Sequence, residues 1–139
     1  MLTMSQPPTA PAPVTVLVVD DSKLARAVAV RLLRQARPDW IAREAAHADE
    51  AASIVAAEPV DMTLLDFNMP GKDGLALAQD LRAARPGMPV AVISANIQDE
   101  VIARARELGA TFLAKPLTGE ALAGFLSGAS LRLRRGGTP

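Results

Sequence analysis

The stretch VTVLVVDD at residues 14–21 decides the fold, because an unbroken apolar run rich in β-branched residues ends at two adjacent carboxylates, Asp20 and Asp21. Runs of this kind are typical of a strand that is buried on both faces of a parallel sheet. Helical spacing follows over residues 22–37 and stops before Pro38, since the residue before a proline disfavours helical backbone. The domain therefore begins with a buried strand, an acidic pair and a helix.

The same alternation continues along the chain. The predicted strands lie at 40–45, 60–65, 90–93 and 111–114, and the predicted helices lie at 49–57, 75–84, 99–108 and from 118 into the 120s. Five strands alternating with five helices indicate an α/β fold, a doubly wound parallel sheet with helices on both faces. Each connection between strands is long enough to contain a crossover helix.

The two ends of the chain differ in composition from this middle part. Residues 1–13 are rich in proline, which suits neither a helix nor a sheet interior, and they predict a disordered leader. Residues 131–139 combine arginine with glycine and predict a basic flexible tail. The domain then occupies residues 14–130, and so short a remainder after it favours a stand-alone domain without a DNA-binding or catalytic output unit.

Composition excludes several classes of function. The 139 residues include no cysteine, which rules out disulfide scaffolds, thiol catalysis and cysteine-ligated metal sites. The single histidine, His47, is read as a loop residue or a helix cap rather than a catalytic group. Basic and acidic residues balance at 15 each, so we expect no nucleic-acid partner. The sequence shows neither a membrane-length apolar run nor a signal peptide, and a cytoplasmic protein is expected.

Polar residues stand where the predicted strands end, which is the edge at which doubly wound sheets bind ligands. These residues are Asp20, Asp21, Asp66, Ser94 and Lys115. Carboxylates that lie close together repel one another, and a divalent cation removes the conflict. Because all the ligands are hard oxygens, the set favours Mg²⁺ over zinc, with Mn²⁺ or Ca²⁺ as alternatives.

The same residues suit phosphoryl chemistry. Lys115 and Ser94 would bind a phosphate as a point charge and a hydrogen-bond partner. Asp66 is the best candidate for a nucleophile, since carboxylates form acyl phosphates. Taken singly, each feature has an ordinary structural explanation: Asp21 or Ser22 can cap a helix, and a Lys-Pro pair can form a turn. Their joint occurrence at successive strand ends favours a functional site.

Four segments resemble the receiver domains of bacterial response regulators. The segment DFNMPGKDG at 66–74 resembles the phosphorylation-site loop of that family. The segment VLVVDDS at 16–22 resembles its first strand and acidic pair. Its fourth and fifth strand ends are resembled by VISA at 92–95 and FLAKP at 112–116. The resemblance covers the chain from residue 14 to about 125. It implies a flavodoxin-like (βα)5 domain with strand order 2-1-3-4-5.

The resemblance also implies a role for each site residue. Asp66 would accept a phosphoryl group from a sensor histidine kinase or a histidine phosphotransfer protein. Mg²⁺ would be held by Asp20, Asp21, Asp66 and the backbone carbonyl of Asn68. Ser94 would hydrogen-bond the phosphoryl group, and Lys115 would form an ion pair with it.

Further positions carry expectations from the same resemblance. The peptide bond before Pro116 would be cis. Asn68 and Asn96 would tune the lifetime of the phosphate. On phosphorylation Ser94 would move toward the phosphoryl group and Phe112 would rotate inward. These movements would alter the face formed by the fourth helix, fifth strand and fifth helix, to which a downstream protein would bind. The alternative output is onward transfer of the phosphoryl group in a phosphorelay.

Three alternatives remain open from the residues. A phosphohydrolase that works through an aspartyl phosphate needs a general acid two residues after the nucleophile, where this chain has Asn68. A flavin-binding module needs a phosphate loop where Asp20 and Asp21 would repel the ligand. A degenerate receiver that functions unphosphorylated is disfavoured by the complete acidic set. The expected protein is therefore no enzyme beyond its own phosphorylation and dephosphorylation.

Overall fold

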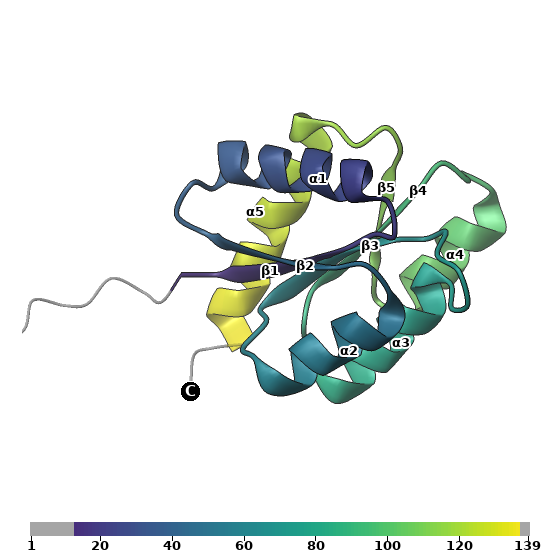
Figure 1. Cartoon of the computed structure of the whole chain (residues 1–139), viewed down its shortest axis with the longest axis horizontal. Helices are drawn as coiled ribbons and strands as arrows, with labels where there is room; N and C mark the ends of the chain where they lie inside the picture. The colour runs from purple at the N-terminus through teal and green to yellow at the C-terminus, as the bar shows by residue number, and fades with distance from the viewer. Residues whose placement is uncertain (1–12, 137–139) are drawn as a thin grey trace, which may run out of the picture.

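The computed structural model describes residues 13–136, in which five strands alternate with five helices (Figure 1). The sheet is parallel throughout and has the order β2-β1-β3-β4-β5, so the predicted fold class is confirmed. The elements are β1 Thr15–Val19, α1 Lys23–Ala36, β2 Ile41–Ala45, α2 Ala48–Ala57, β3 Met62–Asp66, α3 Gly74–Ala84, β4 Val90–Ser94, α4 Asp99–Glu107, β5 Thr111–Ala114 and α5 Gly119–Gly136.

Helices cover both faces of the sheet, as Figure 1 shows, with α1 and α5 on one face and α2, α3 and α4 on the other. The period of two in each strand divides its residues between the layers. In β1, Val16 and Val18 pack toward α1 and α5, whereas Leu17 and Val19 pack toward the other three helices. Because β1, β3 and β4 lie inside the sheet with helices on both sides, their sequences are mainly apolar.

The edge strand β2 shows the opposite pattern. Its residues Ile41, Arg43 and Glu44 are exposed, and only Ala45 is fully buried. This explains why its strand signal in the sequence is weak: only one side of an edge strand pairs with a neighbour, and polar residues are tolerated there.

The prediction of a flexible tail from residue 131 is wrong for 131–136, since α5 continues to Gly136. The buried stripe of α5, formed by Leu122, Phe125, Leu126 and Ala129, is continued by Leu133, which packs against the α1–α5 layer. This spacing matches a helical repeat, so apolar contact outweighs the glycines and arginines that suggested fraying. The predicted leader lies outside the described residues apart from Pro13, and so does the end of the predicted tail, 137–139.

Within residues 13–136, no helix has the combination of length and apolar character that crossing a membrane requires.

Candidate functional site

The sheet order brings the predicted site residues to one edge of the sheet. Asp20 follows β1, Asp66 ends β3, Ser94 ends β4 and Lys115 follows β5. The register sets these ends side by side, since Asp66 pairs with Ile93 and Ser94 pairs with Ala114. Four strands that are parallel neighbours therefore deliver their polar ends to one small area.

Three carboxylates meet there. Asp20, Asp21 and Asp66 each place an oxygen within 4.8 Å of the others. Asp20 and Asp66 are buried, with 8% and 4% of their surface exposed, whereas Asp21 is exposed. Burial raises the pKa of Asp20 above its ordinary value, and the charges of Asp66 and Asp21 raise it further. The hydrogen bond from the Ser22 N–H and the charge of Lys115 lower this pKa, but they do not outweigh burial.

Lys115 supplies the positive charge of the site. Its Nζ lies 2.6 Å from Asp66 Oδ1, and its backbone N–H donates to the Ser94 carbonyl oxygen at 3.0 Å. The Lys115–Pro116 peptide bond is cis, the form that the resemblance implies. Asp66 Oδ1 is buried and accepts no hydrogen bond of normal geometry from the residues described, so the ammonium is its partner. One ammonium faces three carboxylates, and the excess negative charge fits a divalent cation.

The turn after β1 is held by hydrogen bonds to Asp20. The Asp20 N–H donates to the Ala45 carbonyl oxygen at 3.1 Å, and Asp20 Oδ1 accepts from the Ser22 N–H at 2.9 Å. The Ser22 hydroxyl caps α1 by accepting from the Ala25 N–H at 3.2 Å. Of the two candidates for this cap, Ser22 therefore fills the role, and Asp21 is left available for a ligand.

The β3–α3 loop closes tightly on the strand end. A Cβ atom at Gly74 would lie 2.6 Å from the Asp66 carbonyl oxygen and 2.8 Å from the Phe67 Cα, so only glycine fits there. The Gly74 N–H donates to the Phe67 carbonyl oxygen at 2.8 Å. Asp73 then caps α3 by accepting from the Ala76 N–H at 2.8 Å. This closure brings the first residue of α3 against the end of β3, and Asn68 in the loop between them is exposed.

Ser94 lies at the other side of Asp66 and is completely buried. Its hydroxyl oxygen accepts the Asn96 N–H at 2.9 Å, and the Asn96 side chain accepts the Gln98 N–H at 3.0 Å. Phe112 is half-buried and packs against the core on the α2–α3–α4 side. The hydroxyl and the aromatic ring are thus carried by neighbouring strands, β4 and β5.

An apolar cavity of about 330 Å³ adjoins the charged residues. Its wall includes Asp20, Asp66 and Lys115 together with exposed Leu24 and half-exposed Val28 from α1.

Sequence reasoning missed two residues that shape this site. Arg26 reaches back from α1 to the Asp20 carbonyl oxygen, and Gly74 permits the close approach of α3 to Asp66. Both contacts depend on the folded structure, although Gly74 is the last residue of the motif at 66–74. His47 has the role of a helix cap, since its Nδ1 accepts the Glu50 N–H at 3.2 Å.

Comparison with known proteins defines the class. Residues 16–126 match the model of the response regulator receiver domain, and the chain belongs to this family. It is 34% identical to the sensory/regulatory protein RpfC of Xanthomonas campestris over an alignment of 128 residues. This alignment covers 88% of this chain and 17% of RpfC. It is 35% identical over 102 residues to Protein CcdB of Bacillus subtilis, covering 73% of this chain and 84% of CcdB.

A solved structure agrees with this assignment. Chemotaxis protein CheY4 of Vibrio cholerae is similar with a TM-score of 0.77 and 26% sequence identity, over 85% of this chain and 99% of CheY4. The chain is therefore a receiver domain of two-component signalling with a CheY-like fold. Members of this family are generally phosphorylated on an aspartate and bind Mg²⁺, and the aspartate cluster described above is consistent with both properties.

Proposed function

We propose that this protein is a phosphorylation-dependent signalling switch in which Asp66 accepts a phosphoryl group from a sensor histidine kinase or a histidine phosphotransfer protein. One observation carries the proposal: three carboxylates have oxygens within 4.8 Å of one another, and the Lys115 ammonium lies 2.6 Å from Asp66 Oδ1. Asp66 is the carboxylate that ends β3 and faces this ammonium, which makes it the acceptor.

Mg²⁺ is the proposed cofactor, held by Asp20, Asp21, Asp66 and the backbone carbonyl of Asn68. The donor set is made of hard oxygens, which Mn²⁺ and Ca²⁺ also accept. When bound, the cation supplies charge neutralisation for phosphoryl transfer. The pKa of Asp20 supports this assignment: burial raises it and the charges of Asp66 and Asp21 raise it further, and a cation would offset both effects by stabilising the ionised carboxylate.

In the proposed transfer, an Asp66 carboxylate oxygen attacks phosphorus, and the bond from phosphorus to the donor imidazole nitrogen breaks with its electron pair leaving on the histidine. Lys115 stays paired with the transferred group, and the Ser94 hydroxyl donates a hydrogen bond to it. Asn68 and Asn96 flank the acyl phosphate and tune its lifetime. Because asparagine is no general acid, we expect no turnover of small phosphate esters.

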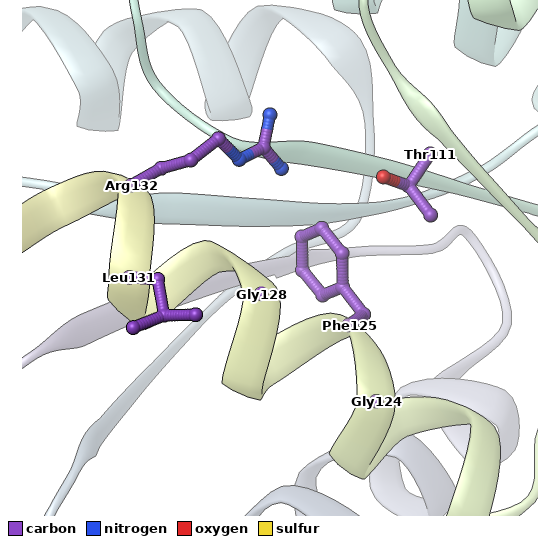
Figure 2. Close-up of a pocket in the computed structure, with 6 residues that line it drawn as sticks. All are labelled: Thr111, Gly124, Phe125, Gly128, Leu131 and Arg132. Atoms are coloured by element: carbon purple, nitrogen blue, oxygen red, sulfur yellow. The ribbon is translucent and has the colours of Figure 1, made fainter.

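The output is a protein contact at the face formed by α4, β5 and α5, or onward transfer of the phosphoryl group in a relay. Movement of Ser94 toward the phosphate and inward rotation of Phe112 would alter this face. A groove of about 440 Å³ between β5 and α5 offers a docking place there. Figure 2 shows that Phe125 and Arg132 of α5 reach from this helix toward Thr111 of β5.

The downstream partner is a protein, and neither nucleic acid nor a membrane is part of the proposal. The balanced charge of 15 basic and 15 acidic residues supports this. Localisation in the cytoplasm stays a prediction.

Incubation with acetyl phosphate and Mg²⁺, followed by intact mass measurement, tests the proposal. We expect one phosphoryl adduct on the wild-type chain, none on Asp66→Asn, and release of the adduct by hydroxylamine, which cleaves acyl phosphates. Asp80→Asn is the matched control, since Asp80 is an exposed carboxylate on α3 and pairs with Lys72 of the β3–α3 loop. An adduct that persists on Asp66→Asn, or none on the wild type, would overturn the proposal.

A further inference from the structure

Arg26 joins the acidic turn to the edge strand. Its Nη1 donates a hydrogen bond of 2.6 Å to the backbone carbonyl oxygen of Asp20, and its Nε lies 3.2 Å from Glu44 Oε1 on β2. The Arg26 side chain is 14% exposed, whereas that of Glu44 is 49% exposed. Because a guanidinium carries its donors in a rigid plane, two simultaneous bonds hold it in one orientation.

The carbonyl bound by Arg26 belongs to the peptide that links Asp20 to Asp21. Asp20 is also held by its bonds with Ala45 and Ser22, so its own carboxylate is fixed. Asp21 is exposed, and within the described part of the chain its side chain makes no hydrogen bond. The plane of this peptide is therefore one determinant of the direction in which the Asp21 side chain leaves the turn.

We propose that Arg26 is a positioning residue for the cation site: it fixes the Asp20–Asp21 peptide and thereby sets the affinity of the acidic cluster for Mg²⁺. Glu44 acts through Arg26 by holding the guanidinium in place. This inference rests on the proposed function, since it assigns a role toward the same cation. Partners that orient metal ligands typically change metal affinity by about 10–100-fold when removed. We expect Arg26→Met to weaken Mg²⁺ binding about tenfold.

A merely structural role for Arg26 would give a different result. Loss of an ion pair between α1 and β2 would lower the stability of the domain but leave the affinity of the folded protein unchanged. Arg43→Met is the matched control, because Arg43 lies on the same strand as Glu44 and pairs with Glu58 through bonds of 2.7 and 2.6 Å. This pair involves none of the aspartates, so its loss should leave Mg²⁺ affinity within about twofold of the wild type.

The experiment is a Mg²⁺ titration of the full chain by calorimetry, at a temperature where urea unfolding shows every variant to be folded. The variants are Arg26→Met, Arg26→Lys, Glu44→Ala and Arg43→Met, with the double variant Arg26→Met/Glu44→Ala. Lysine keeps the charge but cannot bind both partners in the fork, so its affinity should fall between the wild type and Arg26→Met. Glu44→Ala should weaken binding in the wild type and have no effect once Arg26 is absent.

A second measurement follows the backbone directly without any cation. The amide of Asp21 belongs to the peptide whose carbonyl Arg26 binds, so its ¹⁵N chemical shift should change in Arg26→Met and not in Arg43→Met. Wild-type affinity in Arg26→Met with an unchanged Asp21 shift would overturn the inference while leaving the proposed function intact. A wild type that binds no Mg²⁺ would overturn both. If Arg26→Met fails to fold, Arg26→Lys and Glu44→Ala decide between these outcomes.

Discussion

Replacement of Gly74 by alanine tests how closely the β3–α3 loop packs on Asp66. The added Cβ would lie 2.6 Å from the Asp66 carbonyl oxygen and 2.8 Å from the Phe67 Cα, and both are backbone atoms that cannot rotate away. Overpacking of this kind costs about 1–3 kcal/mol, and the better helix propensity of alanine returns at most about 1 kcal/mol. We expect Gly74→Ala to lower the free energy of unfolding by about 1–2 kcal/mol.

Two glycines of α5 provide controls with the opposite sign. A Cβ at Gly124 or Gly128 meets no atom within 4 Å, so alanine adds helix propensity there without a clash. Each substitution should raise the free energy of unfolding by about 0.5–1 kcal/mol. Urea unfolding followed by far-ultraviolet circular dichroism measures all three variants, and a change of 1 kcal/mol corresponds to roughly 4 °C in Tm for a domain of this size.

The close approach also links stability to the site. Relief of the clash at Gly74 must separate the start of α3 from the backbone of Asp66 and Phe67. Gly74→Ala should therefore weaken Mg²⁺ binding, whereas Gly124→Ala should not. If Gly74→Ala proves as stable as the wild type and binds Mg²⁺ equally well, the argument that this loop requires glycine is refuted.

Three further predictions concern charge, cation and helix length. The pKa of Asp20 is raised above the ordinary value of 3.8, so the folded state binds the Asp20 proton more tightly than the unfolded chain does. Without metal, the ionised Asp20 therefore destabilises the domain at neutral pH, and this contribution disappears as pH falls through the raised pKa. Asp20→Asn should be more stable than the wild type at neutral pH in EDTA, and urea titrations at several pH values should show this advantage shrinking as pH falls. Mg²⁺ at 100 times its dissociation constant should raise the free energy of unfolding of the wild type by about 2.7 kcal/mol, and a thermal shift as large in Asp66→Asn would contradict the assigned ligands. Leu133→Ala should cost about 1–2 kcal/mol, because this side chain packs against the α1–α5 layer, while Leu131→Ala, with 56% of the residue exposed, should cost little in the same unfolding assay.

The sequence predicts the fold well where burial is two-sided. The apolar runs of β1, β3 and β4 have one physical explanation, helices on both faces, and the structure confirms it. The end of α5 was predicted wrongly because the sequence shows Gly124, Gly128 and the arginines plainly, while the packing of Leu133 depends on a distant helix. The contact of Leu133 with this layer can be recognised only once the fold has placed α1 and α5 on the same face of the sheet.

The chemistry of the site was predictable for a related reason. Parallel strands end at a common edge, so Asp20, Asp66 and Lys115 could be assigned to one site before their distances were known. Arg26 could not be assigned in this way, since an arginine on an amphipathic helix usually faces solvent and its bond to the Asp20 carbonyl depends on the path of the turn. Gly74 was visible as a glycine, but the 2.6 Å approach that requires it belongs to the backbone of the folded protein.

The electrostatics of the site also bear on the proposed switch. Asp20 and Asp66 are buried beside each other, and their mutual repulsion opposes folding wherever no cation is bound. The backbone of the strand ends beside these carboxylates is fixed by pairing, since β1 lies between β2 and β3 and β3 lies between β1 and β4. Charge added to Asp66 would then act on groups held rigidly by the sheet and on Ser94, which lies in the loop-facing end of β4. A structural response is therefore expected in the segments after β4 and β5 rather than in the buried strands themselves.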